Sequence, residues 1–381
     1  MHRADILVVG GGIAGAATAF YLAREGAEVL VVERLDLGTQ ASGANAGSLH
    51  VQIPHVTFVE EGEEWARRFA PTIRLMRHSV ELWQGLESEL GTDLDVAVPG
   101  GLLVASTDAQ MRDIARKAAL EREQGIEIEI LTAEDVRRMA PYVAPGMVGG
   151  AFCPTEGKAN PLKATFAYAA AAERHGARFR RDTEVLDIGA VSGGFAVETS
   201  GGRIQCRRLV NCAGAAAGRI GAMLGFALPI EAHPIQVSAS EPVAPLVKHL
   251  LYYAGGMLTL KQGRNGSLLI GGGWPANLST VTGLPVVSGD SLRQNLALAQ
   301  SVVPAIGAAR IVRSWAAFVN GTADWNPILG EIPGQQGFFV NFFPWMGFTA
   351  APVCARITAD LVLGRTIEPE FRRHTIQAQA A

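Results

Sequence analysis

The residues with the clearest chemical implication are three glycines near the N-terminus of this 381-residue chain. Gly10, Gly12 and Gly15 follow the apolar run 5–9 and precede an alanine-rich stretch, so they fit G-x-G-x-x-G between a strand and a helix. The first glycine of this pattern makes a tight turn, the second lets the backbone approach a pyrophosphate, and the third lets the helix pack on the sheet. The pattern therefore predicts a dinucleotide site.

Two neighbouring features support this prediction. The helix begins at Ile13 and Ala14, where free N–H groups and the positive end of the helix dipole favour phosphate. Glu33 ends the next apolar run, 28–33, where a carboxylate can accept hydrogen bonds from both hydroxyls of a ribose. The motif by itself does not distinguish FAD from a nicotinamide cofactor.

The segment 38–50 is small, polar and too irregular for a helix, and it comes directly after the ribose-binding strand. Such a loop can run beneath an extended cofactor and reach its far ring with backbone and hydroxyl groups. The alternative is an ordinary surface loop. The candidate contacts are Ser42, Gly43, Asn45, Ala46, Gly47 and Ser48.

With these segments in view, the sequence resembles flavoproteins of the glycine oxidase and D-amino-acid oxidase type, a family that includes sarcosine oxidases and D-amino-acid dehydrogenases. The resemblance covers nearly the whole chain, and the order of its five motifs is more specific than the first motif alone. The motifs are 10–15 with Glu33-Arg34, then 41–47, 156–161, 209–214 and 321–330.

The resemblance implies FAD bound non-covalently in an extended pose. In this family the position of Val185 meets the adenine through its backbone, and Ala213-Gly214 lies near the pyrophosphate. The resemblance also implies that the loop 42–48 lines the flavin ring. Arg34 and Gly330, which belong to the shared motifs, are counted with the cofactor-binding residues.

A turn near the C-terminus has a physical reason to face the flavin. Gly347, Phe348 and Thr349 lead directly into a helix, whose N-terminus can point at the flavin N1–C2=O edge. That edge becomes negative when the flavin is reduced, so a helix dipole there stabilises the product of hydride transfer. The alternative is that Gly347 only turns the chain.

Flavin-dependent amine oxidation requires little of the side chains. The substrate's carbon–hydrogen bond must point at flavin N5 with the amine neutral, and the resulting imine hydrolyses in water. His50 follows the flavin loop and is the candidate catalytic residue, because it could polarise the flavin or a substrate carboxylate. A structural histidine is the equal alternative.

The residues that hold the substrate depart from the family pattern. A tyrosine and an arginine often bind the substrate carboxylate in this family, but Met257 and Val319 occupy the two positions. Either Lys261 or Arg313 serves as the cation instead, or the substrate is not a simple amino acid. An aromatic pocket is a further hypothesis, with core packing as its alternative; its candidates are Tyr252, Tyr253, Trp325 and Trp345.

Composition and missing motifs exclude other functions. A net charge of -3 offers no basic field for nucleic acid or an anionic membrane. The four cysteines and eight histidines have no metal-ligand spacing, and G-x-S-x-G and C-x-x-C are absent from the sequence. The apolar run 6–22 is interrupted by glycines, so we expect no membrane span and a cytoplasmic protein without metal.

The order of the segments predicts how these residues are positioned. We expect an α/β fold, with a Rossmann-like FAD-binding domain and a second, antiparallel-sheet (α+β) substrate domain. The first comprises residues 1–85, 155–228 and 318–381, and the second 86–154 and 229–317.

Several functional hypotheses stay open. The first is an FAD-dependent oxidase or dehydrogenase that acts alone on a small-molecule amine or amino acid. The second is the flavin-bearing catalytic subunit of a heteromeric opine, D-hydroxyproline or sarcosine dehydrogenase, which passes electrons to a partner subunit. The third is a flavin-binding protein without turnover, and a remote fourth is an aromatic hydroxylase.

Overall fold

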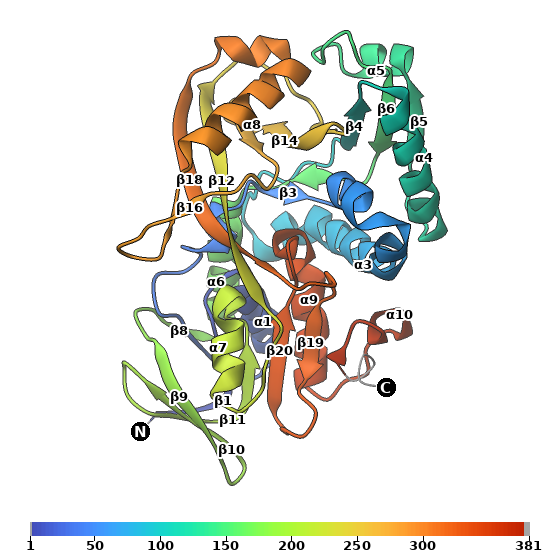
Figure 1. Ribbon diagram of the computed structural model, residues 1–381. Helices are drawn as coiled ribbons and strands as arrows, with labels where there is room; N and C mark the ends of the chain where they lie inside the picture. The colour runs from blue at the N-terminus through green and yellow to red at the C-terminus, as the bar shows by residue number, and fades with distance from the viewer. Residues whose placement is uncertain (1, 377–381) are drawn as a thin grey trace.

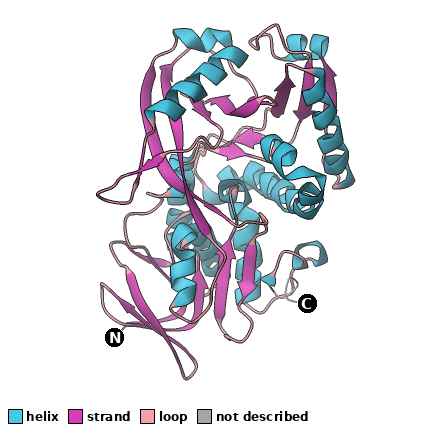
Figure 2. Ribbon diagram, in the orientation of Figure 1, coloured by secondary structure: helices cyan, strands magenta, loops and turns pink. Residues whose placement is uncertain are grey.

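The computed structural model describes residues 2–376, which form two large β-sheets with helices packed around them (Figures 1 and 2). In the first sheet the path β20-β11-β1-β2-β8 is parallel, and β19, β10 and β9 add antiparallel strands. Its strands are β1 (His2–Val9), β2 (Val29–Val32), β8 (Arg178–Arg180), β9 (Val185–Val191), β10 (Gly194–Thr199), β11 (Ile204–Asn211), β19 (Ile328–Glu331) and β20 (Phe338–Phe342).

The centre of this sheet confirms the predicted strand–turn–helix unit. All four residues of β2 are buried, as expected for a parallel strand covered on both faces. Helix α1 (Ile13–Arg24) packs against α6 (Pro161–Arg174) and α9 (Gly347–Val362), and most of its alanines are buried. A shorter helix, α7 (Ala217–Ala222), follows β11.

The second sheet has the order β18-β12-β15-β14-β13-β4-β6-β5 and is antiparallel except between β13 and β4. Its strands are β4 (Gly101–Ala105), β5 (Glu129–Thr132), β6 (Gly149–Cys153), β12 (Glu231–Pro242), β13 (Leu250–Tyr253), β14 (Gly256–Gln262), β15 (Ser267–Gly271) and β18 (Ile311–Gly321). The predicted fold class is confirmed. The domain boundaries stay a prediction, and β18 runs across the one expected at 317.

Long helices flank the sheets. Helix α3 spans His55–Leu90 and bends at Gly62. One face of α3 lies against α9 and α4. The second sheet is accompanied by α4 (Asp108–Glu123), α5 (Ala133–Met139) and α8 (Gly289–Val302). Among residues 2–376, no helix combines the length and the apolar character needed to cross a bilayer.

The segment 38–50 is more ordered than expected. The prediction that it contains no helix was wrong, because Ala41–Ala44 forms one short turn, α2. The Asn45 side chain fixes the end of that turn: its amide donates to the carbonyls of Ala41 and Ser42, and its Oδ1 accepts from Gly47 N–H. The strand β3 (Ser48–Leu49) then pairs with β7 (Gly157–Lys158).

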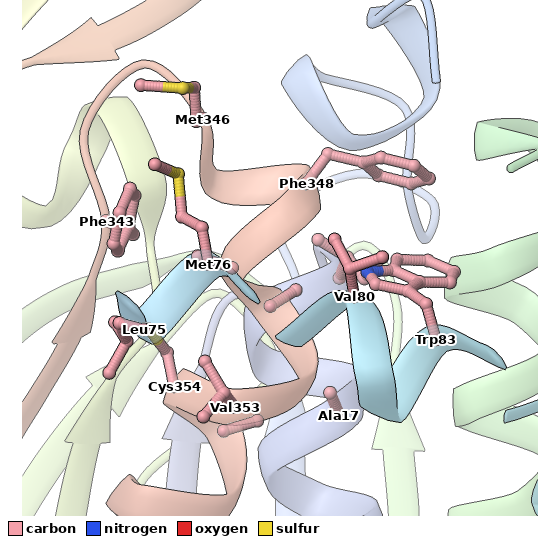
Figure 3. Packing of buried hydrophobic residues seen from close by; sticks show 14 of the residues in the cluster. Ala17, Leu75, Met76, Val80, Trp83, Phe343, Met346, Phe348, Val353 and Cys354 are labelled. Atoms are coloured by element: carbon pink, nitrogen blue, oxygen red, sulfur yellow. The ribbon is translucent and has the colours of Figure 1, made fainter. Parts of the chain in front are cut away.

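Close packing fixes the start of α9. The Trp83 indole lies 4.9 Å from the Phe348 ring, and its Nε1 donates to the carbonyl of Thr349 at 3.0 Å. Figure 3 shows Phe348 over Trp83, with Val353 and Cys354 further along α9 facing the helix that carries Leu75 and Met76. Helix α3 therefore holds the N-terminal turn of α9 in place.

Buried histidines predict acid sensitivity. Burial lowers the pKa of His55, His249 and His374 to about 4. The unfolded chain takes up protons near pH 6.5 while the folded chain does not, so stability falls as the pH drops from about 6.5 towards 4. In that window, each histidine lowers the free energy of unfolding by about 1.4 kcal/mol for each pH unit of acidification.

Urea unfolding followed by circular dichroism at pH 7.5 and pH 5 measures this loss. The variant His249→Asn should lose less stability on acidification than the unmodified protein. Equal or greater stability at pH 5 would contradict the expectation.

Candidate active site

A cavity of about 620 Å³ extends from the first sheet to the second. Its wall includes the glycine turn after β1 and the end of β2, and it continues to the loop 40–50 and the start of α9. On the side of the second sheet, strands β12, β13, β14 and β18 contribute. The cavity thus joins the predicted cofactor residues to the predicted substrate residues.

The glycine turn is built for close approach of a ligand. A Cβ at Gly15 would clash with the carbonyl of Gly10, so only glycine lets α1 start this close to β1. Glu33 is held by two backbone donors: Gly11 N–H at 2.7 Å and Leu35 N–H at 2.9 Å. Gly12 has no side chain to cap α1, and Ser42 Oγ accepts only the first N–H of the helix, that of Ile13, at 2.9 Å. The other N–H groups of the first turn are left for a phosphate.

Most predicted cofactor residues line this cavity. Gly15 packs behind the turn, Gly43 against Gly38 and Gly47 against Ala159. Gly330 lies in β19, paired with Val340, outside the lining. The lining contains Gly10, Gly12, Ile13, Ala14, Glu33, Arg34, Ser42, Asn45, Ala46, Ser48, Val185, Ala213, Gly214, Gly347, Phe348 and Thr349.

The start of α9 is tied to the loop by Thr349. Its hydroxyl accepts the N–H of His50 at 2.9 Å and donates to the carbonyl of Ser48 at 3.2 Å. Within the described chain no side chain caps α9 at Met346, so the free N–H groups of its first turn lie at the cavity. A helix N-terminus at each end of one cavity, with a glycine turn and Glu33, fits an extended FAD.

His50 lines the cavity between the part formed by the predicted cofactor residues and the part formed by the second sheet. Its Nδ1 is 2.7 Å from the hydroxyl of Tyr252, which lies on β13. Burial, and then the nearby Lys261 ammonium, lower the pKa of His50 to about 3. Burial, and then Glu156, raise the pKa of Tyr252. Both side chains are therefore neutral at neutral pH, and the pair can exchange hydrogen bonds without presenting a charge.

The two cations proposed as carboxylate anchors lie outside the lining. Lys261 Nζ donates to Ser48 Oγ at 2.5 Å, so the ammonium sits behind that residue. Burial, and then Lys158, lower the pKa of Lys261 to about 7. Arg313 is exposed, with its guanidinium 5.7 Å from the ring centre of Trp315. Lys261 therefore acts on the cavity through its hydrogen bond to Ser48 and through its charge near His50.

The part of the cavity where a cation was expected to bind the substrate carboxylate is lined by aromatic side chains. Met257, Trp325 and Trp345 line the cavity, and the rings of the two tryptophans stack at 5.0 Å. Both tryptophans have a positive φ, 60° and 57°, which is strained for this residue type. A Cβ at Gly321 would clash with the Trp345 ring. Within residues 2–376, Trp345 Nε1 has no hydrogen-bond partner, and neither has Oδ1 of Asn320.

Sequence reasoning missed a polar part of the wall. Gln52, His55 and Lys117 also line the cavity. Lys117 and Glu121 are spaced as a helical ion pair, which was visible in the sequence. Nothing in the sequence places their helix, α4, against the start of α3.

Comparison with known proteins agrees with this geometry. A model of the family described as FAD dependent oxidoreductase matches residues 5–361. The chain belongs to this family. The protein is accordingly an FAD-dependent oxidoreductase, and the resemblance drawn from its sequence motifs is confirmed.

Relatives of this FAD-dependent oxidoreductase match it over nearly their whole length. It is 32% identical to a glycine oxidase of Geobacillus kaustophilus, over 95% of this chain and 93% of that one. It is 28% identical to an opine oxidase subunit of Agrobacterium tumefaciens over both full chains, and 27% identical to a sarcosine oxidase subunit of Rhizobium meliloti over 94% and 84%. The crystal structure of the Geobacillus glycine oxidase superposes with a TM-score of 0.87 at 28% identity, covering 99% of each chain.

Proposed function

We propose that this oxidoreductase removes a hydride from the carbon next to the nitrogen of an amino acid or a small secondary amine. The observation that carries the proposal is the neutral, largely aromatic wall that faces the loop 40–50 and the start of α9 in one cavity. The relatives named glycine oxidase, opine oxidase and sarcosine oxidase support the substrate class. When bound, FAD accepts the hydride at N5, and the imine that leaves hydrolyses in water.

The chain's own residues orient the substrate and stabilise charge. The N–H groups at Gly347–Thr349 and the dipole of α9 favour negative charge at the start of that helix. The neutral His50–Tyr252 pair can hold a hydrogen bond to the substrate amine in its uncharged form. The stacked tryptophans keep water from the reacting carbon.

Trp345 can supply a neutral hydrogen-bond donor for the substrate carboxylate, which an arginine often binds in this family. Its indole is held between Trp325 and His233, and its buried Nε1–H has no partner within residues 2–376. We propose that this N–H donates to an acceptor on the substrate, such as a carboxylate oxygen. We expect Trp345→Phe to raise KM about three- to tenfold, the value of one neutral hydrogen bond, with a smaller change in kcat.

Steady-state kinetics with an artificial electron acceptor tests this role. Trp65→Phe is the matched control, because Trp65 packs edge-on against Trp325 outside the cavity lining. The role of Trp345 would be refuted if both variants kept the KM of the unmodified protein.

An anaerobic absorbance titration tests the proposed reaction. Purified protein loaded with FAD is titrated with glycine, sarcosine, D- and L-amino acids, prolines and opines. We expect one of these to bleach the flavin band stoichiometrically. A protein that binds FAD and is bleached by no amine would overturn the proposal and favour a flavin-binding role without turnover.

A second candidate function is the flavin-bearing component of a heteromeric dehydrogenase. The observation that favours it is the hairpin of β16 (Asn277–Leu278) and β17 (Pro285–Val286), which carries no charged residue over 276–287 and projects from the second sheet (Figure 1). Val281 is 91% exposed, and Leu278 and Leu284 are more than half exposed. Apolar patches of this kind are typical of protein interfaces.

Two relatives are themselves named as components of larger enzymes, an opine oxidase and a sarcosine oxidase. If this chain has the same role, the protein purified alone should be bleached by its amine and turn over with an artificial dye, yet react slowly with oxygen. Rapid turnover with oxygen by the chain alone would favour an independent oxidase.

A further inference from the structure

The start of α3 and helix α4 form one side of the cavity. This side carries polar groups that have no role in the proposed reaction. His55, the first residue of α3, lines the cavity and is 8% exposed. Neither Nδ1 nor Nε2 of its ring has a hydrogen-bond partner within residues 2–376. Buried polar atoms without partners are costly, so this ring points to a ligand group that pairs with it.

Most of the charged atoms near His55 already have partners. Lys117, beside it on the wall, donates to Glu121 Oε1 at 2.5 Å and to Gln52 Oε1 at 3.2 Å. Glu156 accepts from the backbone N–H groups of Val51 and Gln52 and from the Gln52 amide. Glu121 Oε2 is the exception, because it is buried without a hydrogen-bond partner within residues 2–376. Lys117, the cation on this wall, is already paired with Glu121, so a carboxylate ligand would find no free positive charge there.

We propose that His55 recognises a neutral hydrogen-bonding group, a hydroxyl or an amide, on a part of the substrate other than the reacting carbon and nitrogen. The proposal rests on the amine oxidation proposed above and names a specificity-determining residue for it. A neutral imidazole offers one N–H donor and one lone pair, and hydroxyl and amide groups can satisfy both.

A carboxylate fits this wall less well. It only accepts hydrogen bonds, and it would approach the carboxylate of Glu121, which pairs with Lys117, in a cavity that Glu60 also lines. Burial, and then Lys117, lower the pKa of His55 to about 4, so the ring is uncharged at neutral pH. An uncharged ring favours a neutral partner.

Matched substrate pairs test the inference. In each pair, such as alanine with serine or proline with 4-hydroxyproline, the two amines differ by one hydroxyl. The ratio of kcat/KM, hydroxylated over plain, is measured for the unmodified protein and for His55→Phe, which keeps a ring without nitrogen. We expect the ratio to exceed one in the unmodified protein and to fall about tenfold in His55→Phe, and His55→Gln to restore part of it.

Three readouts separate specificity from a structural role. FAD content and the unfolding temperature should stay close to those of the unmodified protein, and the plain amine should still bleach the flavin. A ratio that is unchanged in His55→Phe would overturn the inference, as would a loss confined to substrates with a second carboxylate. If no amine bleaches the unmodified protein, the proposed function itself fails, which is a distinguishable result.

Discussion

Replacing Gly15 by alanine is expected to produce a protein that retains little FAD. The new Cβ would clash with the backbone carbonyl of Gly10, so α1 must move away from the glycine turn. The N–H groups at the start of α1 would then miss the pyrophosphate. Loss of two such charge-assisted hydrogen bonds weakens FAD binding by at least about a hundredfold.

Binding of FAD to the apoprotein, followed by quenching of flavin fluorescence, measures this effect. Gly85→Ala is the matched control, because Gly85 lies in α3 and a Cβ there would meet no atom of the described chain within 4 Å. FAD binding by Gly15→Ala with unchanged affinity would contradict the assignment of the dinucleotide site.

Removal of the Glu156 carboxylate is expected to have the largest effect on stability. Glu156 is fully buried and accepts hydrogen bonds from Val51 N–H at 2.6 Å and from Gln52 N–H and the Gln52 amide at 2.9 Å. In Glu156→Ala these buried donors lose their acceptor, which lowers the free energy of unfolding by about 3–5 kcal/mol. Glu156→Gln keeps one acceptor oxygen and should lose less.

Urea unfolding of the FAD-loaded variants gives these differences. Glu129→Ala, on the exposed side of β5, is the control and should change stability by less than about 0.5 kcal/mol. Unfolding of Glu156→Ala at the same urea concentration as the unmodified protein would show that the segment 50–52, and with it His50, is held by other contacts.

Local sequence patterns were sufficient to predict the backbone elements around the glycine turn. The strand, the glycine turn and α1 are continuous in the chain, so the spacing of Gly10, Gly12 and Gly15 already specifies their geometry. Glu33 could be placed because it ends the very next strand. The same logic located the start of α9, where a glycine begins a long apolar helix.

The substrate end depends on contacts that are distant in the sequence. His50 meets Tyr252, 202 positions further along the chain, only when the loop 38–50 packs on the second sheet. Trp345 stacks on Trp325 only when the turns before β19 and after β20 come together. A positive φ at tryptophan goes against local preference, so no sequence pattern predicts it. Lys261 was a reasonable candidate anchor, yet its strand directs the ammonium to Ser48 instead of the cavity.

The central claim is that the carbon–hydrogen bond next to the amine nitrogen breaks as the bound FAD is reduced. Stopped-flow absorbance under anaerobic conditions tests it with the bleaching amine in two forms, one with hydrogen and one with deuterium on that carbon. We predict that the deuterated amine bleaches the flavin severalfold more slowly at saturation, because the transferred atom is heavier. Equal rates that stay equal across pH, or bleaching by an analogue without hydrogen on that carbon, would contradict it.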